Sequence, residues 1–260
     1  MRTLRITGAV ILLALLAAGS AAAISGKAVM ENVEDRDRGD SMHALVYMDL
    51  VESDGDVKER IIENWTMDTE SDLLRTVIVF HRPASVQGTR FLVKENENRD
   101  DDQWIYLPAL KRVRRIASGE GDQAFMGTDY SYDDLKSRDV SEDRHTLLRE
   151  ERYNGRDCYV VRSVPKNPGD SQYSKRVQWV AKDIWIPLKA ELYDTDGDLK
   201  KVQTVRELKQ VQGYWTPMKA TMENVQSGHA TKLDINKIRY NEDLDSDLFS
   251  TRYLRTGRVQ

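Results

Sequence analysis

Short runs in which apolar and polar residues alternate fill most of the chain after residue 40, and they predict a protein built mainly of β-strands. Period-two alternation lets one face of a strand pack on a core while the other face meets solvent. Tight-turn sequences, above all Asn154-Gly155, separate many of the runs and favour antiparallel hairpins. The expected strands are residues 42–51, 57–67, 73–80, 89–95, 104–116, 144–153, 156–164, 174–181, 186–193, 200–210, 214–224 and 231–240.

Helical patterns are few. Residues 24–37 predict a short helix that ends in the charged sequence DRDRGD, with Gly39 as its C-cap. Residues 130–138 have a spacing compatible with a second short helix. A terminal segment, residues 245–253, is expected to bring its apolar side chains back to the core.

These elements predict a mainly β (α+β) fold with one large antiparallel sheet. A sheet this wide twists and curls rather than staying flat. We therefore expect the sheet to curl toward a barrel around the few helices. No internal repeat or linker marks a second domain, so residues 24–260 are expected to form a single domain.

The first 23 residues have the organisation of a signal peptide. Arg2 and Arg5 precede an apolar stretch over residues 6–18, and small residues then lead to a cleavage point near Ala23. We expect export to the periplasm without a lipid anchor, because no cysteine follows the cleavage point. The stretch is short for a membrane span, although an uncleaved N-terminal anchor is the alternative.

Charge and cysteine content exclude other classes. The formal net charge is −4 and becomes −6 without Arg2 and Arg5, so an acidic exported product is a poor candidate for nucleic-acid binding. Cys158 is the only cysteine and cannot form an internal disulfide. Its strand-like surroundings favour a small buried residue over a catalytic thiol. We further expect a monomer.

Sequence motifs for catalysis are absent. The four histidines are His43, His81, His145 and His229, and none pairs with another at metal-ligand spacing. The chain has no HExxH motif, no GxSxG elbow and no phosphate-binding loop. The sequence DTDGD at 194–198 fits a hairpin turn better than a calcium loop, because its glycine comes two positions too early. The sequence therefore predicts no catalytic residue, no metal site, no cofactor and no enzymatic activity.

Residues 103–135 combine three features in one run. Trp104 opens a strand-like apolar sequence, and Pro108, which has no backbone N–H to donate, predicts an edge or a bulge. An aromatic segment, residues 125–135, follows a loop that contains glycine, and we expect it to cover an apolar surface. Between these two lie four cations: Lys111, Arg112, Arg114 and Arg115.

The four cations allow two interpretations. In one, they form a solvated strand end whose charge blocks edge-to-edge aggregation. In the other, they bind an anionic headgroup or an acidic partner surface. The sequence leaves both interpretations open.

Large apolar residues at strand positions are the candidates for a lipid site. For any single tryptophan, an ordinary core position is the simpler interpretation. Taken together, these residues carry more apolar surface than a curled sheet with few covering helices can bury. This excess favours a concave apolar ligand cavity. The candidate lipid-binding residues are Trp65, Ile78, Phe80, Phe91, Trp104, Tyr106, Phe125, Met126, Tyr130, Leu135 and Trp179.

One block of the sequence resembles a known family. Residues 91–135 read FLVKENENRDDDQWIYLPALKRVRRIASGEGDQAFMGTDYSYDDL. They are similar to the signature block of the outer membrane lipoprotein-sorting protein group, relatives of the LolA and LolB lipoprotein carriers. The matching pieces are FL at 91–92, WIYLP at 104–108, the basic strand at 111–116, FMGTD at 125–129 and YDDL at 132–135. The sequences MENVEDRDRGD, from Met30, and DLFSTRYL, from Asp247, also resemble the group.

The resemblance implies an unclosed antiparallel barrel with a helical lid and a periplasmic carrier that shields acyl chains of lipoproteins or other lipids between membranes. It implies two partners, an inner-membrane transporter of the ABC or RND/MMPL type and an outer-membrane acceptor. The missing lipobox cysteine argues against an anchored receptor like LolB. A non-enzymatic accessory protein that docks to an exporter or envelope complex is the alternative function.

Overall fold

The computed structural model describes residues 24–69, 71 and 73–259, so the predicted signal peptide, residues 1–23, lies outside the described residues. Within them, thirteen strands form one sheet. The strands are β1 (Ser41–Val51), β2 (Val57–Asp68), β3 (Leu74–Arg82), β4 (Arg90–Lys94), β5 (Asp102–Leu107), β6 (Arg112–Arg115), β7 (Asp143–Tyr153), β8 (Arg156–Pro165), β9 (Lys175–Ala181), β10 (Pro187–Tyr193), β11 (Leu199–Val211), β12 (Tyr214–Asn224) and β13 (His229–Tyr240).

Two short α-helices accompany the sheet, α1 (Gly26–Glu34) and α2 (Thr251–Thr256). Among the described residues, neither they nor any other helix has the length and apolar content that a membrane crossing requires. Single 3₁₀ turns occur at Pro108–Leu110, Ser118–Glu120, Phe125–Gly127, Asp133–Leu135, Val140–Glu142, Pro168–Asp170 and Ser246–Phe249.

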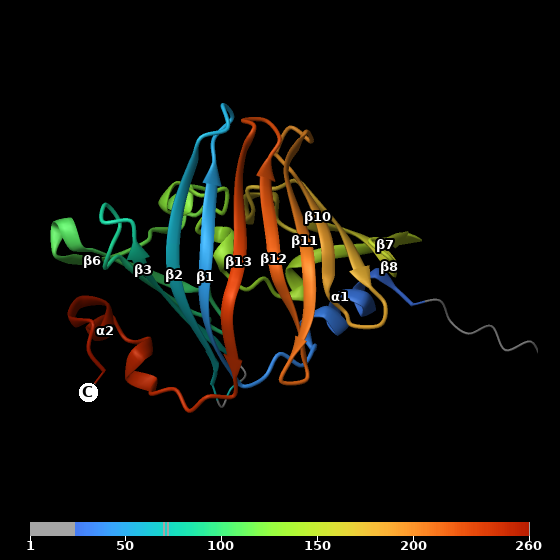
Figure 1. Cartoon of the computed structure of the whole chain (residues 1–260). Coiled ribbons are helices and arrows are strands. Elements are labelled where there is room, and N and C mark those ends of the chain that lie inside the picture. The colour runs from blue at the N-terminus through green and yellow to red at the C-terminus, as the bar shows by residue number, and fades with distance from the viewer. Residues whose placement is uncertain (1–23, 70, 72, 260) are drawn as a thin grey trace, which may run out of the picture.

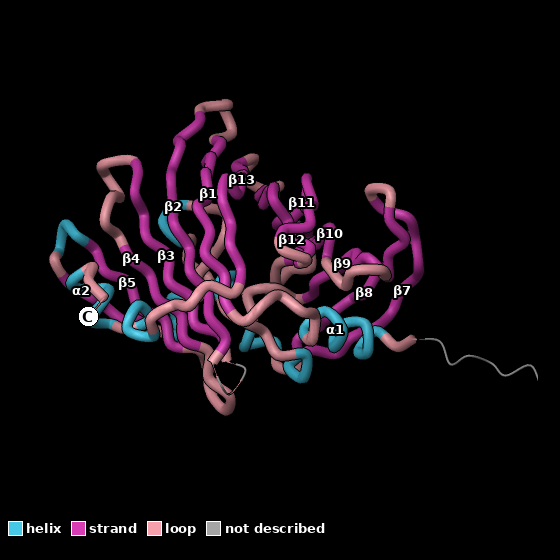
Figure 2. The backbone as a smooth tube through the Cα atoms, turned by 60° about the horizontal axis from the view of Figure 1, so that its bottom comes forward, coloured by secondary structure: helices cyan, strands magenta, loops and turns pink. Residues whose placement is uncertain are grey.

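The sheet consists of two meanders joined at its centre. Its strand order is β6-β5-β4-β3-β2-β1-β13-β12-β11-β10-β9-β8-β7, and β1 pairs antiparallel with β13 where the meanders meet. The edge strands β6 and β7 lie at opposite ends of this order, so the curled sheet is not closed into a barrel (Figures 1 and 2). The predicted mainly β fold with an unclosed antiparallel barrel is confirmed.

The segment that connects the two edges crosses the concave face of the sheet. Residues 117–142, here called the flap, run from β6 to β7 and contain four 3₁₀ turns. In Figure 1 the flap lies behind the central strands. The helix predicted at 130–138 is wrong beyond the turn Asp133–Leu135, because the backbone is extended again at Lys136.

Two predicted boundaries also differ from the structure. The single strand predicted at 104–116 is two strands, β5 and β6, because Pro108 starts a 3₁₀ turn and Lys111 then adopts a left-handed φ of 48°. Helix α1 ends at Glu34, and Asp35 rather than Gly39 is its C-cap. Gly39, at φ +74°, instead turns the chain into β1.

Each face of the first meander has its own apolar core. On the concave face, Phe80, Phe91 and Ile105 pack beneath Phe125 of the flap. On the convex face, Val77 and Leu92 pack beneath the C-terminal segment, whose Leu248 and Phe249 are 6% and 1% exposed. The expected return of this segment to the core is confirmed. Burial of each such side chain stabilises the fold by about 1.5–3 kcal/mol.

Helix α1 packs against the other end of the sheet. Val29, which is fully buried, contacts Val161 of β8 and Val180 of β9. Gly26 lies so close to β7 that a Cβ there would come within 2.6 Å of the Leu147 backbone nitrogen. The helix therefore closes one end of the concave face, and the flap crosses the rest.

Candidate functional site: an apolar cavity beneath the flap

A cavity of about 230 Å³ lies between the central strands and the flap. Its walls come from the concave faces of β1, β2, β3, β12 and β13, and its cover comes from the flap. The lining residues are Met42, Ala44, Val46, Met48, Ile62, Asn64, Ile78, Phe125, Thr128, Tyr130, Leu135, Pro217, Met218, Ala220, Leu233 and Ile235. Nearly all of these side chains are apolar, so the site suits a hydrocarbon ligand.

The strand alternation of β1 builds one wall of the cavity. Met42, Ala44, Val46 and Met48 are two positions apart and therefore share the concave face. Small side chains at Ala44 and at Ala220 on β12 leave the space that larger residues would fill. The cavity is thus a consequence of residue size at the centre of the sheet.

One polar group faces this apolar space without a partner. The side-chain oxygen of Asn64 is sealed from solvent and accepts no hydrogen bond from the described residues. A buried acceptor of this kind costs free energy unless it is paired. It is suited to accept a hydrogen bond from a hydroxyl or amide of a ligand.

An aromatic cluster docks the first part of the flap on the sheet. The ring of Phe125 lies 4.8 Å from that of Phe91 and 5.8 Å from that of Phe80, and it meets Tyr132 edge-on at 5.7 Å. Two backbone carbonyls are also held. Arg60 donates to the Met126 carbonyl at 2.6 Å, and Gln103 donates to the Tyr132 carbonyl at 2.7 Å.

Two carboxylates dock the remainder of the flap. The Asp129 carboxylate accepts a hydrogen bond from the Thr231 hydroxyl at 2.8 Å and pairs with His229 at 2.7 Å, both on β13. Asp134 lies 3.0 Å from Lys201 of β11 and accepts a hydrogen bond from Tyr173. Burial and the nearby Asp134 charge raise the pKa of the Tyr173 hydroxyl, so it stays protonated and donates. The flap is therefore held by side-chain contacts, not by strand pairing.

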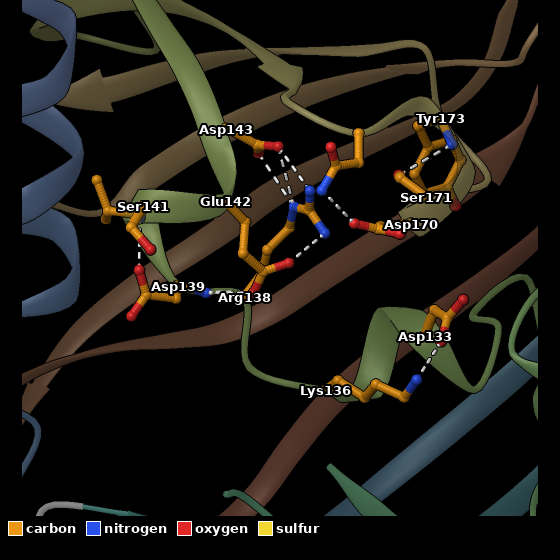
Figure 3. Close-up of polar contacts among 12 residues, drawn as sticks. Asp133, Lys136, Arg138, Asp139, Ser141, Glu142, Asp143, Asp170, Ser171 and Tyr173 are labelled. Atoms are coloured by element: carbon orange, nitrogen blue, oxygen red, sulfur yellow. Dashed lines mark hydrogen bonds and ion pairs between the residues drawn. The ribbon is translucent and has the colours of Figure 1, made fainter. Parts of the chain in front are cut away.

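A second cavity of about 240 Å³ lies beyond Tyr130, which lines both spaces. Its lining is polar and includes Arg138 and Arg176. Figure 3 shows Arg138 between Glu142 and Asp143, to both of which it donates hydrogen bonds. Arg176 approaches the same Asp143 carboxylate at 3.5 Å. The cations of this cavity are thus engaged with carboxylates of the protein.

A third cavity, of about 240 Å³, adjoins the other end of the apolar space. It shares Met42, Pro217 and Ile235 with the cavity beneath the flap. Arg36 and Arg38, from the segment between α1 and β1, line this third cavity but not the cavity beneath the flap. The concave face therefore contains an apolar tract that ends in two arginines.

The structure brings some of the predicted lipid-binding residues together. Ile78, Phe125, Tyr130 and Leu135 line the cavity beneath the flap. Phe80, Phe91 and Met126 belong to the adjoining core cluster. These seven side chains lie on the predicted concave surface.

Four others lie on the opposite face of the sheet. Trp65, Trp104 and Tyr106 pack beneath the C-terminal segment, because each is one strand position away from a concave residue. Trp179 also lies on the opposite face, buried in a core cluster with Val160, and its indole N–H donates to Glu151. The structure does not bring these four residues to the cavity.

Strand alternation also divides the basic cluster. Arg114 pairs with Glu120 at 2.7 Å on the concave side, whereas Arg115 pairs with Asp102 on the convex side. Lys111 and Arg112 are exposed at the strand end. The four cations therefore do not form one continuous patch.

Sequence reasoning missed most of the cavity wall. The residues of β1, β12 and β13 that line it were not among the predicted candidates. The period-two pattern of Met42, Ala44, Val46 and Met48 was the available signal. The small residue Ala44 within that pattern leaves space for a ligand, whereas the predicted candidates are all large apolar side chains.

Asp101, in the loop between β4 and β5, is expected to make stability depend on pH. Burial raises its pKa to about 6, and its Oδ2 atom accepts no hydrogen bond from the described residues. Because the folded-state pKa is raised, the folded protein takes up a proton, and stability falls as pH rises from about 4 to about 6.

Asp101→Asn is therefore expected to stabilise the protein at pH 7.5 by on the order of 1–2 kcal/mol, allowing for partial exposure, with little effect at pH 4. Urea unfolding at both pH values measures this. Asp100→Asn, at an exposed neighbour, is the control. Equal effects of Asp101→Asn at the two pH values would contradict the expectation.

Comparisons with known proteins identify relatives of this fold. A protein-family model described as an uncharacterized protein matches residues 73–256. The crystal structure of a DUF1329 family protein from Desulfovibrio piger is 32% identical with a TM-score of 0.84, and the match covers 88% of this chain and 97% of that one. A putative outer membrane lipoprotein-sorting protein domain from Vibrio parahaemolyticus is 33% identical with a TM-score of 0.83, over 88% and 98% of the two chains.

A LolA superfamily protein from Nitrosomonas europaea shares the fold at lower identity. It is 22% identical with a TM-score of 0.69, and the match covers 89% of this chain and all of that one (100%). A comparison with curated proteins finds no significant match.

Proposed function

This chain belongs to the DUF1329 family, and we propose that it is a periplasmic carrier that holds acyl chains of lipoproteins or other lipids beneath the flap. The observation that carries the proposal is the cavity itself. It has apolar walls on a curled sheet and a cover that is not part of the sheet. No catalytic group is needed for this function, since burial of apolar surface supplies the affinity.

The size of the cavity supports a cover that moves. Its volume of about 230 Å³ is below the roughly 300–1,000 Å³ typical of ligand sites. The adjoining cavity at Met42, Pro217 and Ile235 adds about 240 Å³, which brings the apolar tract into that range. A longer chain requires displacement of the flap residues Phe125 and Leu135.

The energetics of exchange favour a reversible carrier. An acyl chain in a bilayer is already out of water, and each methylene is worth about 0.8 kcal/mol there as well as in the cavity. The net driving force between bilayer and protein is therefore small. Partner proteins must give the transfer its direction.

We propose an inner-membrane transporter of the ABC or RND/MMPL type as the donor and an outer-membrane protein as the acceptor. The relative described as a putative outer membrane lipoprotein-sorting protein domain supports a lipid or lipoprotein ligand, and both transfer partners are part of the proposal.

Docking to an exporter or envelope complex is the second candidate function. Leu110 is 67% exposed beside the exposed Lys111 and Arg112, where β6 forms the edge of the sheet. An exposed apolar side chain next to two cations suits an acidic partner surface.

A vesicle assay separates the two functions. Protein mixed with vesicles that contain a fluorescent phospholipid, and then separated from them, is expected to carry lipid in solution. The double variant Lys111→Glu/Arg112→Glu is expected to extract as much lipid, because neither residue lines the cavity. Absence of lipid from the wild-type fraction would contradict the carrier function, and loss of an envelope partner by the variant would then favour docking.

A further inference from the structure

We propose that Arg36 binds an anionic group at the head of the acyl cargo. The inference rests on the proposed carrier function and narrows its substrate class. The cargo is then an amphiphile whose phosphate or carboxylate lies at the end of its hydrocarbon chain. The predicted basic cluster at Lys111–Arg115 is not this headgroup site.

Arg36 lies where the apolar tract ends. It lines the third cavity together with the apolar side chains of Met42, Ile235 and Ile238. Since Met42 and Ile235 also line the cavity beneath the flap, a chain that occupies both spaces brings its end to Arg36. A headgroup at that end meets the guanidinium.

Among the described residues, Arg36 has no carboxylate within ion-pair distance, although the charge of Asp37 acts on it from farther away. Within residues 24–69, 71 and 73–259, Arg36 forms no ion pair, and its Nε atom is sealed from solvent without a hydrogen-bond acceptor. Burial, followed by the nearby Arg38 charge, lowers the pKa of Arg36. Arg36 is partly buried. A partly buried cation without an ion pair tends to destabilise a fold, so its presence here favours a role with a ligand.

Two described carboxylates near Arg36 have other contacts. Asp37 accepts a hydrogen bond from the backbone N–H of Gly39 at 3.1 Å. Asp68, which lines the same cavity as Arg36, lies 3.9 Å from Arg38. Arg138 of the second cavity, by comparison, donates hydrogen bonds to Asp143 and Glu142. Arg36 therefore differs from the structural arginines of that cavity.

The segment that carries Arg36 is fixed in place. Gly39 has a φ of +74°, and a Cβ there would lie 2.8 Å from the side-chain oxygen of Asn241. That same oxygen accepts a hydrogen bond from the Asp40 N–H at 2.9 Å. These contacts fix the backbone three and four residues after Arg36, which reduces the backbone entropy lost when a ligand binds there.

A guanidinium selects for planar or tetrahedral oxyanions. Its forked donors match the oxygens of a phosphate or a carboxylate, and such charge-assisted bonds are stronger than neutral ones. A phospholipid phosphodiester and a fatty-acid carboxylate both supply this chemistry. An uncharged acylglycerol does not.

The test measures binding of three single-chain probes of equal chain length: lysophosphatidylglycerol, the free fatty acid and the monoacylglycerol. The wild-type protein is expected to bind at least one anionic probe about tenfold more tightly than the neutral one. Arg36→Gln is expected to remove that preference and to leave monoacylglycerol affinity within about threefold. Which anionic probe is preferred distinguishes a phosphodiester from a carboxylate.

Thermal unfolding of the empty proteins separates a binding role from a structural one. Arg36→Gln is expected to leave Tm unchanged or to raise it, because it removes a partly buried charge that forms no ion pair with the described residues. A fall in Tm together with equal losses for all three probes would show a structural role instead. Arg112→Gln, at an exposed arginine outside the cavities, is the matched control and is expected to change neither quantity.

The remaining outcomes are also decisive. Tight binding of all three probes without preference overturns the role of Arg36 and leaves the carrier function standing. Binding of none of them contradicts the carrier function, and with it the inference.

Discussion

Ala220→Trp is expected to reduce acyl-chain binding about a hundredfold while the protein stays folded. Ala220 lines the cavity beneath the flap, opposite Leu233 on the neighbouring strand. An indole there occupies the volume of about four methylenes of a ligand. At ~0.8 kcal/mol for each methylene, the loss of binding free energy is about 3 kcal/mol, which corresponds to about a hundredfold in affinity. Because the added ring enters empty space, the usual overpacking cost of about 1–3 kcal/mol is largely avoided.

Titration with a fluorescent fatty acid measures this effect, and circular dichroism confirms the fold. Ala230→Trp is the control, because Ala230 pairs with Val51 and the exposed Glu223 on the convex face. It is expected to bind the probe as the wild type does. Undiminished binding by Ala220→Trp would place the ligand elsewhere in the protein.

The double variant Phe125→Ser/Met126→Ser is expected to release the flap and lose bound lipid while the sheet stays intact. Phe125 is 2% exposed and contacts three other aromatic rings, and removal of such a ring costs about 3–5 kcal/mol. The Arg60 hydrogen bond to the Met126 carbonyl does not depend on the side chain. Hydrogen exchange should therefore accelerate over residues 117–142 more than in β1 or β13.

Phe249→Ser provides the comparison, since Phe249 is 1% exposed but packs on the convex face. It is expected to lower the free energy of unfolding by a similar amount without a change in lipid retention at equal folded fraction. If the two variants lose stability and lipid in the same proportion, Phe125 and Met126 are ordinary core residues and the flap is not a cover.

The architecture could be predicted because strand patterns are local. Twelve runs of alternating residues correspond to the thirteen strands, and Asn154 and Gly155 have the two positive φ values, 47° and 81°, that a type I′ turn requires. The additional strand arises from one residue, Pro108. From the sequence, Pro108 predicts an edge or a bulge, and in the structure it divides the predicted strand in two.

The cavity could be predicted only in part, because alternation does not say which face is concave. Trp104 and Ile105 are consecutive, and only packing by segments distant in sequence assigns the first to the C-terminal helix side and the second to the flap side. The same rule divides Arg114 from Arg115. That division was available from the sequence, since adjacent strand residues point to opposite faces.

The sequence does not identify Arg36 as a site residue, and the reason is a different one. In the sequence, DRDRGD has the composition of a solvated helix end, and each arginine has an aspartate beside it. The three-dimensional structure turns Asp37 toward Gly39 and leaves Arg36 without an ion pair in the part of the chain that is described. Whether an aspartate neutralises a neighbouring arginine depends on the directions of the two side chains. Amino-acid composition does not show those directions.

Native mass spectrometry of the wild-type protein, purified without detergent from cells that export it, tests the central claim most directly. The carrier function predicts a protein mass increased by one or more lipids, and extraction should identify an acyl chain with an anionic group. The Ala220→Trp variant, purified in parallel, should lack most of that mass. A wild-type protein that shows only its polypeptide mass, with a cavity that stays empty when lipid is added, would contradict the account.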